Sequence, residues 1–183
     1  MQEDEKWEVL SSDIVLQHPF LGVRMEAVRL PSGRVIDGWP IVDTRSYVMV
    51  VVENQAGELL ILEGYKHGLG RSSWQVVGGY LEEGEEPKVA ARREMLEESG
   101  YESEEWQALG SFVVDANRRA GTAHIFLARH SRPASKVQSD DLERVALRWV
   151  TVAEASRALY DGRIAILSTA VALALALPLL HGD

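Results

Sequence analysis

Apolar and polar residues alternate along much of the first half of the chain. Alternation with a period of two is typical of β-strands that bury one face. The half-buried strands expected on this basis are residues 7–16 and 23–30. After a turn at Pro31-Ser32-Gly33, residues 35–42 follow as the second limb of a hairpin. A further run, residues 46–53 (SYVMVVVE), is almost continuously apolar, which predicts a strand that is buried on both faces. Residues 58–63 (ELLILE) return after a turn at residues 54–57.

The second half of the chain mixes strand and helix patterns. Residues 74–77 lead into Gly78-Gly79, and the strands expected after the helix are residues 106–115, 124–129 and 144–150. A helix is predicted from Pro87 to Ser99, because proline suits the first helical turn and Gly100 suits its end. Thr151 and Glu154 form a capping box, and that helix should end at Asp161-Gly162. Strands first and helices interspersed later predict an α+β fold with a mixed sheet.

The segment 164–180 is the most apolar part of the chain. Ser168 and Thr169 lie inside it, and Pro178 lies near its end. It is shorter than the about 20 apolar residues that a membrane span needs. We therefore expect a C-terminal helix that is buried or faces a second subunit, and no membrane partner.

Composition and charge narrow the functional classes. The chain has 183 residues, 46% hydrophobic and 26% charged, which fits one globular domain, with or without an arm. Its net charge of −9 argues against nucleic acid or an anionic membrane as the main partner. It contains 0 cysteines, which excludes disulfides and thiol chemistry. Since residues 1–10 lack an apolar run, a cytoplasmic location is expected.

The helix expected at residues 87–99 carries an unusual group of charges. Glu94, Glu97 and Glu98 share one helix face, where like charges repel and the helix dipole is unfavourable. Arg93 can pair with Glu97 and relieve part of this repulsion. One interpretation is a solvated acidic face, and the other is a site for a hard divalent cation such as Mg²⁺ or Mn²⁺.

The spacing of this segment resembles the Nudix box. The residues that carry the resemblance are Gly79, Glu85, Arg93-Glu94, Glu97-Glu98 and Gly100. Tyr101 departs from the usual aliphatic residue at the last position. Residues 64–68, 74–79 and 161–164 also resemble the ADP-ribose pyrophosphatase-like branch. The resemblance implies an α/β/α sandwich at residues 46–183, preceded by a strand arm at residues 1–45 that joins two subunits of a homodimer.

The resemblance also implies roles for individual residues. Glu94 and Glu98 would be the main metal ligands for two or more ions, joined by Glu97 and a backbone carbonyl at Gly78 or Gly79. Arg93 would orient the carboxylates, and Glu85 would support the loop or an outer ion. A loop carboxylate usually completes such a site as the general base, and the candidates are Glu143, as base or metal ligand, and Asp141.

Substrate contacts are less clearly indicated. Trp39 and Tyr65 could stack on a base, because aromatic faces hold purines. The cations that could bind phosphate are Lys66, Arg71, Arg118 and Arg119. Two segments, residues 64–66 and 75–79, differ from the ADP-ribose pattern, and Asn117 lies where that group has a proline. The resemblance therefore indicates the class of reaction more strongly than it indicates the substrate.

These observations predict a Mg²⁺-dependent hydrolase that cleaves a nucleoside diphosphate linked to another group, with ADP-ribose or a nucleoside diphosphate sugar as first choice. Two alternatives stay open. One is a Nudix-fold domain that senses nucleotides without turnover, and the other is a house-cleaning nucleoside triphosphatase.

Overall fold

A computed structural model describes residues 6–136 and 145–180 of the chain. It divides into two compact units. Unit 1 comprises residues 1–46 and 113–122, and unit 2 comprises residues 47–112 and 123–183. The predicted assignment of separate functions to an arm and a domain stays a prediction, and each unit is described by itself.

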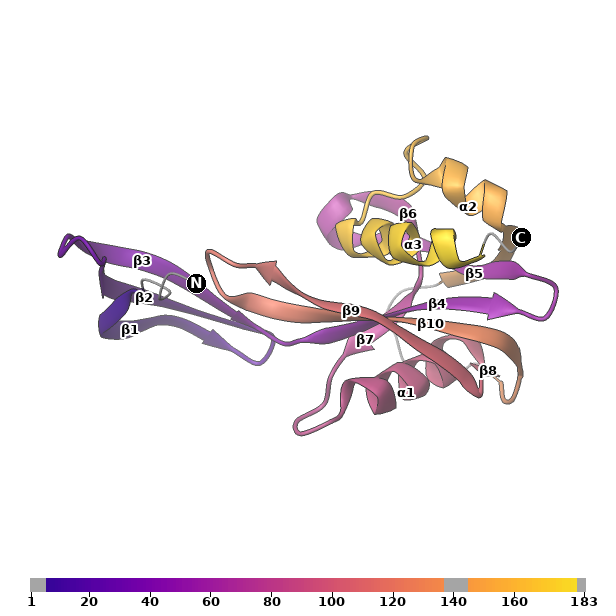
Figure 1. Ribbon diagram of the computed structural model, residues 1–183, viewed down its shortest axis with the longest axis horizontal. Coiled ribbons are helices and arrows are strands. Elements are labelled where there is room, and N and C mark those ends of the chain that lie inside the picture. The colour runs from indigo at the N-terminus through magenta and orange to yellow at the C-terminus, as the bar shows by residue number, and fades with distance from the viewer. Residues whose placement is uncertain (1–5, 137–144, 181–183) are drawn as a thin grey trace. The chain divides into compact units, whose positions relative to one another are not determined.

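Unit 1 is built on an antiparallel sheet of three strands in the order β1-β2-β3 (Figure 1). The strands are β1 (Glu8–His18), β2 (Leu21–Arg29) and β3 (Val35–Thr44). The expected turn joins β2 to β3, where the Gly33 amide donates to the Leu30 carbonyl at 2.9 Å. Gly33 has a φ of +83°, a conformation that favours glycine.

The strand β1 forms as expected, but the prediction that it is half-buried is wrong. All 11 of its residues are exposed, and Ile14 keeps 72% of its surface accessible. Within the described residues β1 pairs with β2 alone. The alternation of apolar and polar residues indicates which face of a strand is suited to burial. It does not indicate whether another element covers that face.

Unit 2 contains a mixed sheet. The strand order is β11-β5-β4-β10-β8, with β6 beside β5, β7 beside β4 and β9 beside β10. The strands are β4 (Tyr47–Asn54), β5 (Glu58–Lys66), β6 (Arg71–Gln75), β7 (Val77–Tyr80), β8 (Tyr101–Glu102), β9 (Glu105–Asp115), β10 (Ala120–Pro133) and β11 (Val145–Thr151). The pair β10–β4 is parallel, and the pairs β4–β7 and β5–β11 are antiparallel.

Helices cover both faces of this sheet. The helix α1 (Pro87–Ser99) lies on one face, and α2 (Val152–Ala158) and α3 (Leu167–Leu180) lie on the other (Figure 1). Two apolar clusters correspond to these faces. Met95 of α1 packs with Val50 and Phe126, while Leu173 of α3 packs with Val51 and Ile125. The predicted α+β fold and α/β/α sandwich are confirmed.

The helix boundaries follow local capping. Gly100 adopts the left-handed conformation and its amide donates to the Leu96 carbonyl at 2.8 Å, so α1 ends where predicted. The Thr151 hydroxyl accepts from the Glu154 amide at 3.1 Å, which confirms the threonine half of the capping box, whereas the Glu154 carboxylate binds Arg163 at 3.0 Å. The helix α2 ends at Ala158, before the predicted Asp161-Gly162, and α3 begins at Leu167. No helix in the described ranges is long and apolar enough to cross a membrane.

The structure adds details that the sequence pattern did not predict. Residues 74–77 are divided at Val76 between β6 and β7, which pair with different neighbours. A short 3-10 helix, η1 (His67–Leu69), connects β5 to β6. The strand β10 continues to Pro133, into the segment expected to be a loop.

Candidate active site

Two adjacent glycines in β7 define the centre of the site. A Cβ atom added to Gly78 would lie 2.5 Å from the Val48 carbonyl oxygen and 2.9 Å from Met49 Sδ. A Cβ atom added to Gly79 would instead collide with the carboxyl group of Glu94. Consecutive strand residues point to opposite faces, so Gly78 opens the α3 face and Gly79 opens the α1 face.

Two carboxylates of α1 lie against this glycine pair. Glu98 Oε2 accepts a hydrogen bond from the Gly78 amide at 2.9 Å. Glu94 fills the space where a side chain at position 79 would begin. The separation of these residues by one helical turn, predicted from the sequence, therefore brings both carboxylates to the same short segment of backbone.

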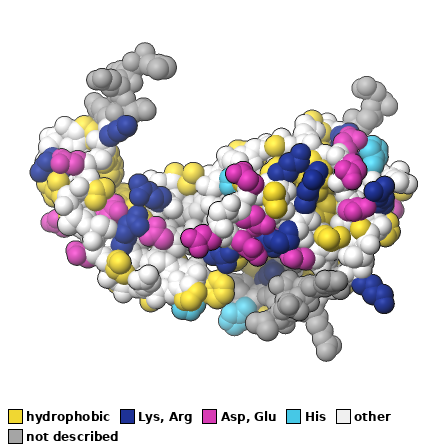
Figure 2. Space-filling model, turned by 90° about the horizontal axis from the view of Figure 1, so that it is seen from below, with side chains coloured by type: hydrophobic (Ala, Val, Ile, Leu, Met, Phe, Trp, Pro, Cys, Tyr) yellow, Lys and Arg dark blue, Asp and Glu magenta, His cyan; other side chains and the backbone are white. Residues whose placement is uncertain are grey.

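Arg93 binds three carboxylates of the segment. Its guanidinium donates to Glu85 at 2.9 Å, to Glu94 at 2.7 Å and to Glu97 at 3.1 Å. It also donates to the Tyr80 carbonyl at 3.1 Å. The pKa of Arg93 is raised far above its ordinary value, mainly by the Glu85 hydrogen bond. Seen from the α1 side, acidic and basic side chains are interspersed (Figure 2).

Glu85 connects this network to the loop before α1. One of its oxygens accepts from the Glu82 amide at 2.9 Å, and its side chain is only 10% exposed. The Arg93 hydrogen bond is the main cause that holds the pKa of Glu85 below its ordinary value, against the opposing effect of burial. Glu85 thus stays ionised and shapes the loop.

The donor chemistry suits a hard divalent cation, because the carboxylates of Glu94, Glu97 and Glu98 supply only oxygen. Among residues 6–136 and 145–180, however, no three acidic or histidine side chains converge closely enough to hold a metal ion. Arg93 lies between Glu94 and Glu97, and Glu98 is bound to backbone. The predicted outer carboxylates Asp141 and Glu143 lie outside the described residues.

The predicted substrate residues of unit 2 lie in different places. Lys66 shares with Gly78 and Gly79 a cavity of about 520 Å³. Tyr65 is exposed. Arg71 lines a separate polar cleft, where it donates to the Gly162 carbonyl at 3.2 Å. The structure therefore brings Lys66, and neither of the other two, into a cavity with the glycine pair.

The other predicted substrate residues belong to unit 1. Trp39 packs edge-on against Trp7 with ring centroids 5.3 Å apart, and its Nε1 donates to the Asn117 carbonyl at 3.0 Å. Trp39 and Arg119 line a cavity of about 370 Å³. Arg118 does not line it and is paired with Asp115 at 2.8 Å.

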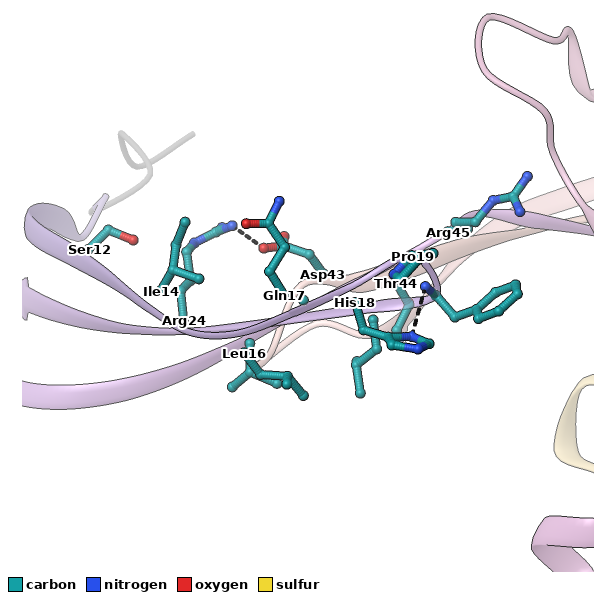
Figure 3. A pocket seen from close by; sticks show the side chains of 14 residues that line it. Ser12, Ile14, Leu16, Gln17, His18, Pro19, Arg24, Asp43, Thr44 and Arg45 are labelled. Atoms are coloured by element: carbon teal, nitrogen blue, oxygen red, sulfur yellow. Dashed lines mark hydrogen bonds and ion pairs between the residues drawn. The ribbon is translucent and has the colours of Figure 1, made fainter.

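A larger cavity of about 640 Å³ lies along the β1–β2 hairpin and the end of β3. Arg24 and Asp43 point toward one another across it and form an ion pair (Figure 3). Arg24 also binds Glu26 at 2.9 Å. This internal pairing leaves the rest of the wall mainly apolar, with Ile14 and Leu16 among its residues.

Sequence reasoning missed three hydroxyl residues beside the glycine pair. Tyr47, Ser168 and Thr169 line the same cavity as Lys66. Burial raises the pKa of Tyr47 above its ordinary value, against the opposing hydrogen bond from Ser168. The available signal was the polar pair Ser168-Thr169 inside an otherwise apolar helix.

Comparison with known families matches residues 43–168 to the NUDIX domain. The chain belongs to the Nudix family. Residues 7–42 match the nucleoside diphosphate sugar hydrolase N-terminal domain. The resemblance drawn from the box is thereby confirmed, and the Nudix chain is a hydrolase that acts on anhydrides. Nudix hydrolases generally use divalent metals such as Mg²⁺.

Named relatives cover most of this Nudix chain. The ADP-ribose pyrophosphatase of Mycobacterium tuberculosis is 28% identical, over 88% of this chain and 78% of its own length. The ADP-ribose pyrophosphatase of Bacillus subtilis is 27% identical, over 86% of this chain and 88% of its own length. The methanol dehydrogenase activator of Bacillus methanolicus is 30% identical, over 82% of each chain.

A solved structure supports the fold. A structure described as an ADP compounds hydrolase superimposes with a TM-score of 0.84, covering 98% of this chain and 97% of its own. The sequence identity is 19%. The match extends over almost the whole chain, so it confirms the architecture and leaves the substrate to be argued from the site.

Proposed function

We propose that this Nudix protein hydrolyses a nucleoside diphosphate linked to another group, releasing a nucleoside monophosphate and a phosphorylated product. ADP-ribose and nucleoside diphosphate sugars are the first substrates to test. The observation that carries the proposal is the contact of Glu94 and Glu98 with the Gly78-Gly79 backbone. Family membership and the names of two relatives support the same reaction class.

In the proposed reaction, a water oxygen bonds to one phosphorus and the bridging P–O bond breaks. The bridging oxygen leaves with the electron pair, and the proton of the attacking water passes to a carboxylate. Asp141 or Glu143 is proposed as that base. Bound divalent ions supply neutralisation of the phosphoryl charge in reactions of this kind.

The described residues contribute position and charge. Glu94, Glu97 and Glu98, with the Gly78 carbonyl, are proposed to hold Mg²⁺ or Mn²⁺, in two or more sites. Arg93 fixes the carboxylates from the side, and Glu85 in turn fixes Arg93. Lys66 is proposed to contact a phosphoryl group, since it is the described cation that shares a cavity with the glycine pair.

We propose further substrate contacts in both units: Trp39 and Arg118 in unit 1, with Arg119 as an alternative, and Tyr65 and Arg71 in unit 2. Assembly is proposed to involve unit 1. The exposed apolar side chains of β1 support a homodimer in which residues 1–45 cover the partner subunit. We also propose a cytoplasmic location, in keeping with a nucleotide substrate.

The test is a release screen with Mg²⁺ across ADP-ribose, nucleoside diphosphate sugars, dinucleotides and nucleoside triphosphates. We expect turnover of at least one diphosphate-linked compound, and a loss of about 100-fold or more in Glu98→Gln. Exposed Glu83→Gln is the matched control and should keep its rate. Preference for triphosphates would favour the house-cleaning reaction, and no turnover of any compound would favour a sensing domain.

Assembly needs its own measurement. Light scattering coupled to gel filtration should give the mass of two chains, because the apolar face of β1 is exposed in a single chain. Ile14→Glu should shift the mass to one chain by placing a charge in the proposed interface. A mass of one chain for the unmodified protein would exclude the dimer.

A further inference from the structure

The cavity on the α3 side of β7 contains a buried polar group whose partner is missing from the described protein. Thr169 forms part of the cavity wall and is 0% exposed. Its Oγ1 has no hydrogen-bond partner among the residues that the structure describes. A buried hydroxyl without a partner destabilises a fold. Its presence therefore points to a group that enters from the cavity.

The first turn of α3 faces this cavity with its own unpaired donors. Ile166 precedes the helix and accepts from the Ala170 amide at 3.0 Å, but its side chain cannot cap. The amides at Leu167, Ser168 and Thr169 consequently have no acceptor within the helix. The first turn contains no acidic residue. The helix start therefore presents positive partial charge to the cavity.

The cavity wall also contains a cationic side chain. Lys66 is the one charged side chain among the described residues that line the cavity. Lys66 therefore adds a cation to this wall, in a chain whose net charge is −9. A cation together with hydroxyl donors favours a ligand that is rich in acceptor oxygens.

The position of the cavity connects it to the carboxylates. Gly78 and Gly79 line it on one side of β7, while Glu94 and Glu98 contact the same glycines. Within the described sheet β7 pairs with β4 alone, and its remaining backbone groups bind side chains of α1, as the Gly78 amide does with Glu98. The glycine pair is therefore shared by the carboxylates and the cavity.

We propose that this cavity, the α3 pocket, binds a phosphoryl or carboxylate group. The group is either carried by the substrate beyond its scissile diphosphate or is free in solution. The first source rests on the proposed function, and the second does not. Lys66, the first turn of α3 and the Thr169 hydroxyl are the elements that recognise the anion.

Binding of inorganic phosphate to the full chain in EDTA tests the anion site without turnover. Isothermal titration should show saturable binding, weakened about tenfold in Lys66→Met and about fivefold in Thr169→Val. Lys88→Met removes an equal charge from the exposed surface of α1 and should bind normally. No saturable binding to the unmodified protein, or equal binding by Thr169→Val, would overturn the proposal.

Melting temperatures separate lost recognition from lost folding. Thr169→Val keeps the side-chain shape and removes the unpaired hydroxyl, so it should melt at a higher temperature than the unmodified protein. A lower melting temperature would mean that the hydroxyl has a structural partner, and the proposal would fail.

A matched pair of ligands distinguishes the two sources. UDP-glucuronate and UDP-glucose differ by one carboxylate, and their binding is compared in metal-free buffer. A substrate-borne anion predicts about tenfold tighter binding of UDP-glucuronate, lost in Lys66→Met. If UDP-glucuronate and UDP-glucose bind equally and inorganic phosphate also binds, the ligand of the pocket is free phosphate. If the hydrolysis screen fails while phosphate still binds, only the proposed function is lost.

Discussion

The helices α1 and α3 cover opposite faces of one sheet, and different forces hold them there. The helix α1 buries Met95 against the sheet, and it also carries Arg93, which forms ion pairs with three carboxylates. The helix α3 buries mainly Leu and Ala side chains and carries no charged residue. The α1 face should therefore respond to pH and salt, whereas the α3 face should respond to side-chain volume.

The two faces also differ in which residues indicate a site. On α1 the spacing of the carboxylates identifies the site, because charges alone are common on helix surfaces. On α3 the Thr169 hydroxyl is informative, because the helix is otherwise mainly apolar and the described residues supply no hydrogen-bond partner. A polar residue is therefore a stronger indication of a functional site when the surrounding sequence is apolar.

The largest expected difference concerns the two glycines that separate the faces. Gly79→Ala should lower kcat by about 100-fold or more, because its Cβ displaces the Glu94 carboxyl while that flexible side chain can move at little cost in stability. Gly78→Ala should instead destabilise the fold by about 1–3 kcal/mol, since it meets the Val48 backbone. Steady-state kinetics and urea unfolding measure both. Full activity in Gly79→Ala would remove Glu94 from the site.

The α3 face is probed by removing volume. Leu173 is 0% exposed, so Leu173→Ala should lower the free energy of unfolding by about 2–5 kcal/mol. The loss should be the same in low and high salt, because no charge is involved. Leu179, on the same helix and 41% exposed, supplies the matched control Leu179→Ala. A loss in the control as large as that in Leu173→Ala would contradict this account of the face.

The α1 face is probed by removing its central cation. Arg93→Met should lower the free energy of unfolding by about 2 kcal/mol, because Glu85 and Glu94 lose a shared partner in a partly exposed setting. The difference should shrink in 1 M salt as screening weakens the ion pairs. Arg93→Lys keeps the positive charge but loses the planar, multidentate guanidinium. Its free energy of unfolding should therefore lie between those of Arg93→Met and the unmodified protein. Salt-independent loss would assign Arg93 a packing role.

The smallest effect is the pH dependence of Glu85. Its folded pKa is lowered, so its contribution to stability is present above the ordinary glutamate pKa of about 4.3 and is lost as the pH falls through the folded value. Glu85→Gln should therefore be less stable than the unmodified protein at pH 7, with the gap closing in acid. Urea midpoints from pH 7 to pH 3 test this. A gap that widens in acid would contradict the ion pair.

Much of α1 could be predicted from sequence because its determinants are local. Pro87, Gly100 and the Arg93–Glu97 pair act within a few residues, and the structure shows each in the expected place. The capping box at Thr151 and Glu154 is equally local. The Gly79–Glu94 contact was implied by the family motif, since chain spacing alone does not bring β7 to α1.

The remainder depends on contacts that no short pattern encodes. The exposure of β1 depends on what covers it, which alternation does not report. The split between β6 and β7 follows from their separate partners, β5 and β4. The proximity of Ser168 and Thr169 to Lys66 and the glycine pair depends on the tertiary fold, so the sequence did not identify them as site residues.

The exposure of β1 has a consequence for how this protein should be handled. Any molecule that covers the strand binds its folded form, so by mass action the apparent stability of unit 1 rises with the concentration of that molecule. If a second copy provides the cover, dilution lowers that stability. Rates measured at nanomolar enzyme and melting curves measured at micromolar protein would then describe different species. A dilution series belongs with every comparison of variants.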